Sequence, residues 1–249
     1  MQFNNSEMSM SAHFRELRAR AISCIIWFCI IFIICYLYSN KIYQFLLEPF
    51  VNISQNNPHR KLIYTSPTEG FTTYLKLSFY SAIFFALPIF FAEIYFFLSP
   101  ALYKNEKKNV LFIMFFSAFL FLFGAIFCYY FILPMALNFF SSFENTSLEV
   151  GDTLPIILET KISDYLNFAI NLLFGFGIAF LSPILLLFLI KSGFVKIKDL
   201  RSKRRYWIVI IFILSAILTP PDVLSQISLA ILLIIIFEIV ILIGKYFNK

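Results

Sequence analysis

The sequence has little charge and few of the residues that build metal, redox or nucleotide sites. Only 14% of its 249 residues are charged and 60% are hydrophobic, whereas soluble domains have roughly 25% charged residues. The two histidines, His13 and His59, lie outside the long apolar runs, so no imidazole at membrane depth can ligate haem. The four cysteines are spaced by five, six and ninety-three residues, which fits neither a CxxC redox pair nor zinc ligation. These absences predict an integral membrane protein that holds no metal or redox cofactor.

Nucleotide-binding loops and internal repeats are also missing. Neither GxxxxGKS/T nor GxGxxG occurs in the chain, so a nucleotide enzyme or an ATP-driven pump lacks its phosphate-binding loop. The absence of a detectable repeat weakly disfavours the secondary transporters that are built from repeated halves. We therefore expect a protein that is not an enzyme and that draws any driving force from a source other than nucleotide hydrolysis.

Six apolar stretches predict an all-α membrane protein, because about 20 apolar residues cross the ~30 Å hydrocarbon layer as a helix. The first stretch is interpreted as a retained helix and not as a cleaved signal peptide. The fifth has thirteen residues and the sixth has nine uninterrupted apolar residues at its centre, so both helices are expected to be short. The predicted spans are residues 21–38, 77–98, 110–133, 165–190, 206–218 and 223–244. They belong to one predicted membrane domain, residues 1–249, whose first 20 residues form a cytoplasmic amphipathic segment.

Lys and Arg are distributed unevenly over the connecting segments. Fifteen of them lie on the side that holds both termini, and five lie on the other side. By the positive-inside rule, both termini are expected to face the cytoplasm. The same bias explains the net charge of +6 without a nucleic-acid partner, and it suits contact with anionic membrane lipid. The two long external segments, residues 39–76 and 134–164, contain several prolines and are expected to be ordered caps.

Three acids are predicted at or near membrane depth, where a charge must be paired or solvated. Glu93 and Glu238 lie near the cytoplasmic ends of their helices, from which they can extend to the membrane interface. Asp222 lies in the tight turn before the last helix, which it can cap through the first free amides. Gln226 lies four residues further on, so Asp222 and Gln226 form a polar stripe that is expected to face protein or water.

Two more acids lie among basic residues on the expected cytoplasmic side. Glu16 lies in HFRELRAR with Arg20 as its i+4 partner, an ion pair worth roughly 0.2 to 0.5 kcal/mol. Glu106 lies in SPALYKNEKKN, where a solvated charge or a helix cap is the ordinary interpretation. The residues alone therefore give both acids a structural explanation.

Several motifs resemble the TatC family, the large polytopic subunit of the twin-arginine protein translocase. They follow in order from about residue 10 to residue 245: HFRELRAR, LLEPF, FFLSPALYKNEKK, FGIAF with SP, and LTPPDVLSQ with LAI and FEI. The resemblance implies six helices in a concave, glove-like bundle in the bacterial cytoplasmic (inner) membrane, which is favoured over an organellar inner membrane. It implies export of folded proteins, driven by the proton-motive force, after recognition of signal peptides with two consecutive arginines. It also implies an oligomeric complex with small single-span partners of the TatA and TatB type.

The resemblance assigns roles to particular positions in this sequence. Signal-peptide binding is assigned to Glu16, Arg18, Phe97, Tyr103 and Glu106. Contact with a partner helix, or another polar role within the membrane, is assigned to Asp222, Gln226 and Glu93. A structural or external-loop role is assigned to Pro49, Lys76 and Pro100. No catalytic residue and no metal ligand is implied.

The fourth predicted span departs from the family pattern. Relatives commonly have Glu in a phrase like F-E-x-P, whereas this chain has Leu181 between Phe180 and Ser182. Glu93 lies where a neutral polar residue is expected, so it is a candidate to compensate for the missing acid. Two other classes remain open: a proton-coupled small-solute transporter, and an anchor subunit of a respiratory complex, which the lack of membrane histidines disfavours. Co-purification of single-span helices and precursors would separate the three classes.

Overall fold

The computed structural model describes residues 10–54, 61–99, 104–144, 159–191, 195, 197–220 and 222–247. Their secondary structure is helical almost throughout, with two three-residue strands. The chain divides into two compact units. Unit 1 comprises Met1–Ser39 and Ser78–Ala118, and unit 2 comprises Asn40–Leu77 and Phe119–Lys249.

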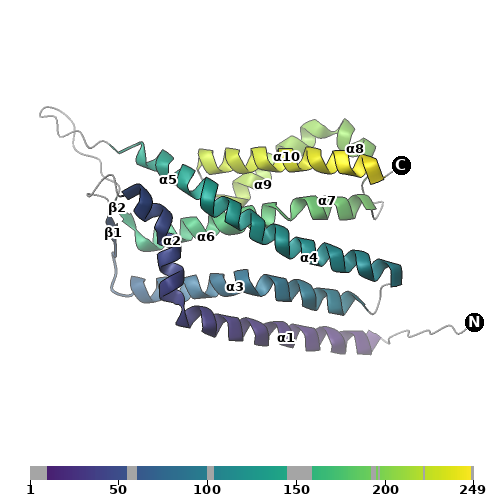
Figure 1. Cartoon of the computed structure of the whole chain (residues 1–249), viewed down its shortest axis with the longest axis horizontal. Helices are drawn as coiled ribbons and strands as arrows, with labels where there is room; N and C mark the ends of the chain where they lie inside the picture. Colours follow the sequence, from purple (N-terminus) through teal and green to yellow (C-terminus); the bar gives the residue numbers. More distant parts are fainter. Residues whose placement is uncertain are drawn as a thin grey trace, which may run out of the picture. The chain divides into compact units, whose positions relative to one another are not determined.

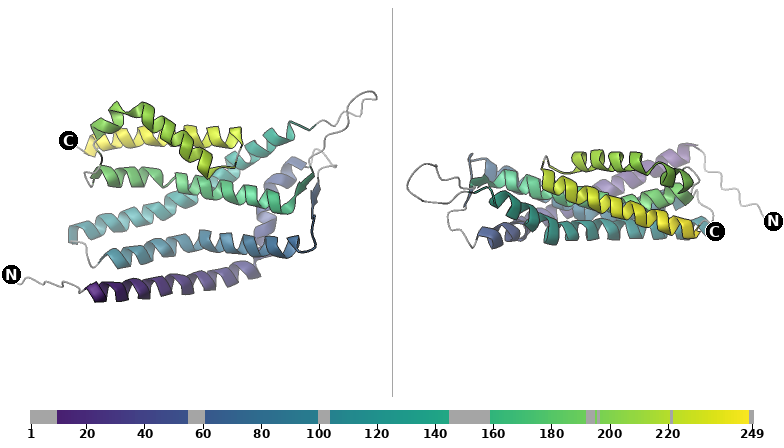
Figure 2. Two further views of the ribbon diagram at one scale, coloured as in Figure 1. Left: turned by 180° about the vertical axis from the view of Figure 1, so that it is seen from behind. Right: turned by 90° about the horizontal axis from the view of Figure 1, so that it is seen from above.

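Unit 1 is formed by one complete helix and parts of two others. Helix α1 (Met10–Leu37) lies beside the C-terminal part of α3 (Glu69–Leu98), and α4 (Lys104–Phe127) contributes its N-terminal part (Figures 1 and 2). Phe28 of α1 meets Phe79 of α3 edge to face, with ring centroids 5.5 Å apart. Because α1 is continuous from Met10, the described part of the expected N-terminal segment forms the first turns of the first predicted span.

Unit 2 contains the remaining helices and a buried apolar core. Its α9 and α7 lie beside α10, as Figure 1 shows. Leu133, Leu172 and Phe176 in this core are fully buried. The helical elements are α2 (Ser39–Ser54), the π-helical turn η2 (Cys128–Ile132), α5 (Leu133–Ser141), α6 (Ile162–Ala179), α7 (Ser182–Lys191), α8 (Ile197–Ser202), α9 (Arg204–Leu218) and α10 (Val223–Phe247).

Two glycines of α6 allow close helix packing in unit 2. A Cβ atom added at Gly175 would collide with the backbone carbonyl oxygen of Leu218 at the end of α9. A Cβ atom at Gly177 would lie 2.6 Å from the Phe121 ring of α4. Helix α6 therefore approaches both neighbours at distances that only glycine permits.

The first part of the first predicted external segment forms helix α2 (Ser39–Ser54), and Pro49 lies buried inside this helix. Proline has no N–H, so the carbonyl of Phe45, four residues earlier, lacks its intrahelical donor. The Tyr129 hydroxyl donates to this carbonyl at 2.7 Å, and the Tyr165 hydroxyl donates to the next carbonyl, that of Leu46, at 2.6 Å. We call these five residues the α2 anchor, because they connect α2 to η2 and α6 through hydrogen bonds.

A small parallel sheet and a carboxylate connect two further segments of unit 2. Strand β1 (Lys61–Ile63) pairs in parallel with β2 (Glu159–Lys161). Just beyond them, the Glu69 carboxylate accepts the backbone N–H and hydroxyl of Thr65 at 2.7 and 3.0 Å, and those of Ser163 at 3.3 and 2.7 Å. The start of α3 is thereby bonded to the start of α6.

Three helix predictions are corrected by the structure. The third span does not end before Pro134: a π turn, with the Leu133 N–H bonded to the Cys128 carbonyl, accommodates the proline, and the helix continues as α5. The fourth span is two helices, because Phe180 and Leu181 form a turn between α6 and α7. The last helix is not short, since α10 has 25 residues and includes the polar residues Ser225, Gln226 and Ser228 in its first turns.

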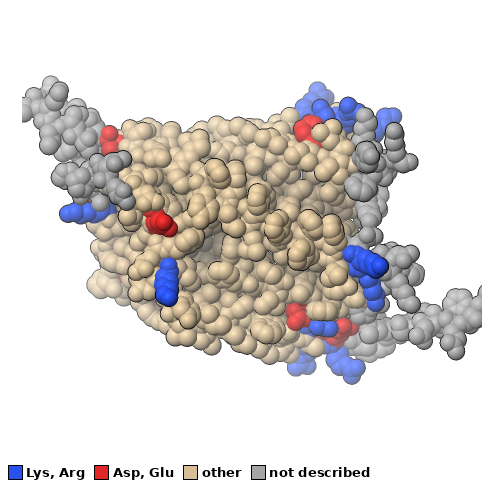
Figure 3. Space-filling view, viewed as in Figure 1, with Lys and Arg blue, Asp and Glu red and all other residues tan. Residues whose placement is uncertain are grey.

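Among the described residues, five helical segments are long and apolar enough to cross a membrane. Helix α9 has 15 residues, or roughly 22 Å of length, which confirms that the fifth predicted helix is short. On the face drawn in Figure 3, uncharged residues predominate. Such a surface suits contact with lipid tails. The five segments are His13–Leu37, Glu69–Leu98, Val110–Ser141, Ile162–Ile190 and Val223–Gly244.

Candidate functional site

The first turns of α1 present four polar side chains on one face. His13, Glu16, Arg20 and Ser23 are separated by three, four and three residues, which places them above one another along a helix. We call this set the α1 polar face. Its partners in unit 1 are residues of α3.

Glu93 of α3 is bound by two residues of the α1 polar face. An Arg20 guanidinium nitrogen donates to one carboxylate oxygen at 3.1 Å, and the Ser23 hydroxyl donates to the other at 2.6 Å. Only 12% of the Glu93 side chain is exposed, so these donors stabilise a charge that is largely removed from solvent. The Arg20 guanidinium also lies over the Phe96 ring, 5.2 Å from its centroid. Glu93 is therefore paired within unit 1.

Glu16 is held much more loosely than Glu93. One carboxylate oxygen lies 3.9 Å from an Arg20 nitrogen, which is an ion pair but too long for a hydrogen bond. Its other oxygen, Oε2, is buried and has no hydrogen-bond partner among the described residues. One turn before it, His13 stacks on Phe97 of α3 with ring centroids 4.6 Å apart. The α1 polar face thus contains a carboxylate that can accept further donors.

Of the other residues predicted to bind a signal peptide, the structure describes the side chains of Arg18 and Phe97. Arg18 is exposed, and helical periodicity puts it away from the α1 polar face. Phe97 is partly buried against His13. Glu106 lies in the first turn of α4, but its side chain is outside the described residues, as are Tyr103 and Pro100.

Sequence reasoning missed part of this arrangement. Arg20 was expected to pair with Glu16, whereas its shorter bond is to Glu93. His13 and Ser23 received no role, although their spacing from Glu16 and Arg20 marks one helix face. The missing information was which helix packs against that face.

The second predicted polar site lies in unit 2, where Asp222 precedes α10. Its Oδ1 atom accepts the Ser225 backbone N–H at 2.7 Å, so Asp222 caps the helix, as one interpretation of the sequence predicted. The Oδ2 atom of Asp222 and the hydroxyl of Ser225 are both buried without a hydrogen-bond partner among the described residues. Gln226, on the next turn, is partly exposed. The cap therefore leaves polar atoms available beside it.

Lys76 and Leu181, two further positions singled out in the sequence, also lie in unit 2. Lys76 is exposed and borders a cavity of about 30 Å³ that Thr72, Thr73 and Asn167 also line. Leu181 is partly buried in the turn between α6 and α7. Compensation for the missing acid by Glu93, which belongs to unit 1, stays a prediction.

Long apolar helices and few charges define the chain as a multi-pass membrane protein. Residues 12–231 match the family model described as TatC, Sec-independent protein translocase protein. The chain belongs to the TatC family.

Relatives and solved structures cover nearly the whole chain. The Sec-independent protein translocase protein TatC of Rickettsia prowazekii is 47% identical over 238 residues, 96% of this chain and 93% of that protein. That of Aquifex aeolicus is 36% identical over 238 residues, 96% and 95% of the two chains. A crystal structure described as "Twin Arginine Translocase Receptor- TatC" matches with a TM-score of 0.76 at 35% identity, covering 95% of this chain and 100% of the other. A second, in the detergent DDM, matches with a TM-score of 0.75 at 36% identity, covering 93% and 99%.

Proposed function

We propose that this chain is the signal-peptide receptor of a twin-arginine translocase in a bacterial cytoplasmic membrane. It crosses the membrane six times as one domain in a concave bundle, with short α9 as the fifth span and both termini in the cytoplasm. It acts in an oligomeric complex with small single-span subunits of the TatA and TatB type. The complex exports folded precursors and is driven by the proton-motive force. Family membership and the charge bias of the loops support this assignment.

The observation that carries the proposal is the free oxygen of Glu16. A guanidinium has five N–H donors in a planar fork that suits a carboxylate, and such a bond contributes roughly 1.5 to 3 kcal/mol. Glu16 Oε2 is buried and unpaired among the described residues, so it has capacity for such a donor. We assign Glu16 to one signal-peptide arginine and Glu106 to the other, with Phe97 and Tyr103 beside the flanking apolar residues.

Arg20 provides an internal example of the recognition that we propose. Its guanidinium binds the Glu93 carboxylate at 3.1 Å and covers the Phe96 ring. In the proposed mechanism, the bond to Glu93 keeps Arg20 from hydrogen-bonding Glu16, whose free oxygen stays available for the incoming arginine. Lys107 and Lys108, which follow Glu106 in α4, disfavour cationic segments that lack two well-placed guanidinium groups.

We assign contact with a partner subunit to the end of α10 that Asp222 caps. The unpaired Asp222 Oδ2 atom, the Ser225 hydroxyl and the amide of Gln226 form a small polar area at the start of a membrane helix. A polar side chain on a single-span partner would satisfy these atoms. Gln226→Leu leaves the cap intact, and we expect it to reduce partner crosslinking. Wild-type crosslinking in this variant would contradict the assignment.

The receptor function is tested by site-specific crosslinking of a twin-arginine precursor to membranes that contain the full chain. We expect Glu16→Gln and Glu106→Gln each to reduce precursor binding about tenfold or more, because each removes a charge-assisted hydrogen bond. Asp199→Asn is the matched control, since Asp199 is an exposed acid on α8. Normal binding and export in both glutamate variants would show that these carboxylates do not recognise the signal.

A further inference from the structure

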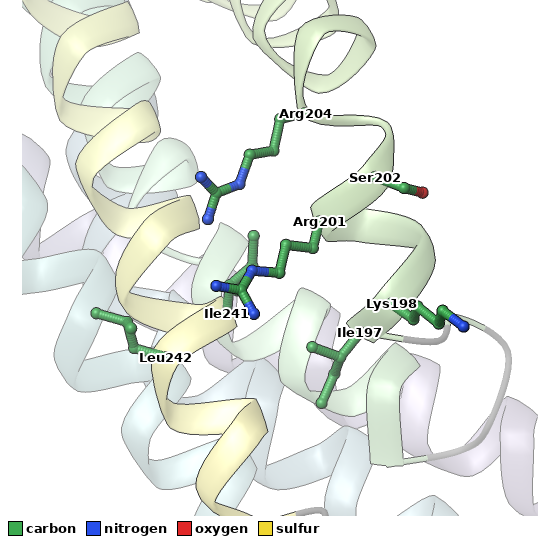
Figure 4. Close-up of a pocket in the computed structure, with 7 residues that line it drawn as sticks. All are labelled: Ile197, Lys198, Arg201, Ser202, Arg204, Ile241 and Leu242. Atoms are coloured by element: carbon green, nitrogen blue, oxygen red, sulfur yellow. The ribbon is translucent and has the colours of Figure 1, made fainter.

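A basic cavity lies beside the C-terminal part of α10 in unit 2, at the opposite end of this helix from Asp222 and Gln226. Its volume is about 490 Å³. Figure 4 shows Arg201 and Arg204 extending towards α10, whereas Lys198 and Ser202 point away from it. The residues that line the cavity are Ile197, Lys198, Arg201, Ser202, Arg204, Ile241 and Leu242.

The charges around this cavity are not balanced. The Arg204 guanidinium donates to the Glu238 carboxylate of α10 at 2.9 Å, so the Arg204 charge is neutralised by an ion pair. Arg201 is exposed and makes no ion pair within the described residues, and none of the described residues that line the cavity is acidic. Arg201 therefore gives the cavity an unpaired positive charge, which suits an anion.

The helix that carries this charge is anchored to the core. Leu200 of α8 is 1% exposed and belongs to the buried core of unit 2. Ile197 lies so close to α10 that a Cβ atom added at Gly244 would be 3.1 Å from it. The arginine therefore projects from a helix that is fixed in place, which makes the cavity a formed site.

An exposed apolar stripe on α10 leads from the cavity along the membrane span. Ile231, Ile235, Ile239 and Leu242 are 51%, 52%, 47% and 67% exposed, and their spacing of four, four and three residues places them on one face. From Ile231 to Leu242 the helix is roughly 16 Å long, similar to half of the ~30 Å hydrocarbon layer. Leu242 also lines the cavity, so the stripe and the basic cavity are continuous.

We propose that this cavity and stripe bind one anionic phospholipid, with its phosphate at Arg201 and an acyl chain along α10. The continuity of a basic cavity with an apolar stripe of this length favours a lipid over a free phosphate. A cationic signal segment would be repelled by the same charge. The site is independent of the α1 polar face and of signal recognition.

Native mass spectrometry of the purified full chain, titrated with phosphatidylglycerol or phosphatidylcholine in detergent, tests the proposal. We expect phosphatidylglycerol to bind more tightly, and Arg201→Gln to lower its affinity about tenfold through the lost charge-assisted bond. Arg205→Gln is the matched control, because the Arg205 guanidinium stacks on Tyr206 and does not line the cavity. Equal loss in the two variants, or no loss in either, would overturn the proposal.

A second pair of variants separates a lipid from a small anion. Leu242→Ser keeps every charge and removes an exposed contact, so we expect it to weaken phosphatidylglycerol binding roughly fivefold. Ile227→Ser, at the opposite end of α10 and also exposed, should have no effect. Unchanged binding in Leu242→Ser, or displacement of the lipid by inorganic phosphate, would show a simple anion site and contradict the proposal.

Discussion

The α2 anchor and the α1 polar face both place polar groups in apolar surroundings, but they differ in how completely those groups are paired. In the anchor, two tyrosine hydroxyls each reach a helix carbonyl at 2.6 to 2.7 Å. At the α1 polar face, Glu93 of α3 accepts a hydrogen bond at each carboxylate oxygen, whereas Glu16 keeps a buried oxygen without a partner among the described residues. Complete pairing suits a structural role, whereas a free acceptor suits a ligand. The variants below test this distinction.

The largest loss of stability is expected in the anchor. Tyr129→Phe leaves the Phe45 carbonyl, which Pro49 deprives of its helical donor, without a partner, and this costs about 1 to 3 kcal/mol of unfolding free energy. Tyr36→Phe is the control, since Tyr36 is 42% exposed on α1. Thermal unfolding in detergent should separate the two variants, and precursor binding at the folding-permissive temperature should be unchanged in both. Equal unfolding temperatures of the two variants would contradict the claim that the tyrosine hydroxyl bonds of the α2 anchor stabilise the fold.

A smaller loss is expected at Asp222, whose cap combines one paired and one unpaired oxygen. Asp222→Ala removes the bond to the Ser225 N–H and should cost about 1 kcal/mol of unfolding free energy. Asp222→Asn keeps an oxygen for the cap and should cost only a few tenths of a kcal/mol. The two variants therefore differ in capping while both lose the carboxylate charge. Identical destabilisation, measured by thermal unfolding, would mean that capping is not what Asp222 contributes.

The smallest effect on stability, but a measurable effect on function, is expected for Glu93→Gln. The amide keeps an oxygen that can accept from Arg20, whose side chain is 36% exposed, so the lost charge costs up to about 1 kcal/mol. Loss of the Glu93 charge releases Arg20 towards Glu16, so precursor crosslinking should fall although Glu16 is intact. Increased or unchanged crosslinking would show that Glu93 does not keep Arg20 away from Glu16.

The sequence predicted the long apolar helices and the short α9. Each of these follows from local patterns of length and hydrophobicity. The sequence did not predict α2, because Pro49 was treated as a feature of a loop. The structure shows why the helix tolerates it: Tyr129, which is distant in the chain, satisfies the freed carbonyl.

Other features depended on contacts that no local pattern contains. The parallel pairing of β1 with β2 joins residues 61 and 159, and neither three-residue strand stands out in the sequence. Likewise, the spacing on α1 marks a polar face, but only the packing of α1 on α3 identifies Glu93 as the partner of Arg20. For the candidate site, the sequence indicated the acids and the structure distinguished the paired one from the unpaired one.

The central claim, that Glu16 recognises a signal-peptide guanidinium, is tested most directly by a double comparison. Binding of precursors with an Arg-Arg or a Lys-Lys signal is measured for the wild-type chain and for Glu16→Gln. We expect the wild-type chain to prefer the Arg-Arg signal, and we expect this preference to fall about tenfold in the variant, because the guanidinium loses its carboxylate. An undiminished preference for Arg-Arg in Glu16→Gln would contradict the account.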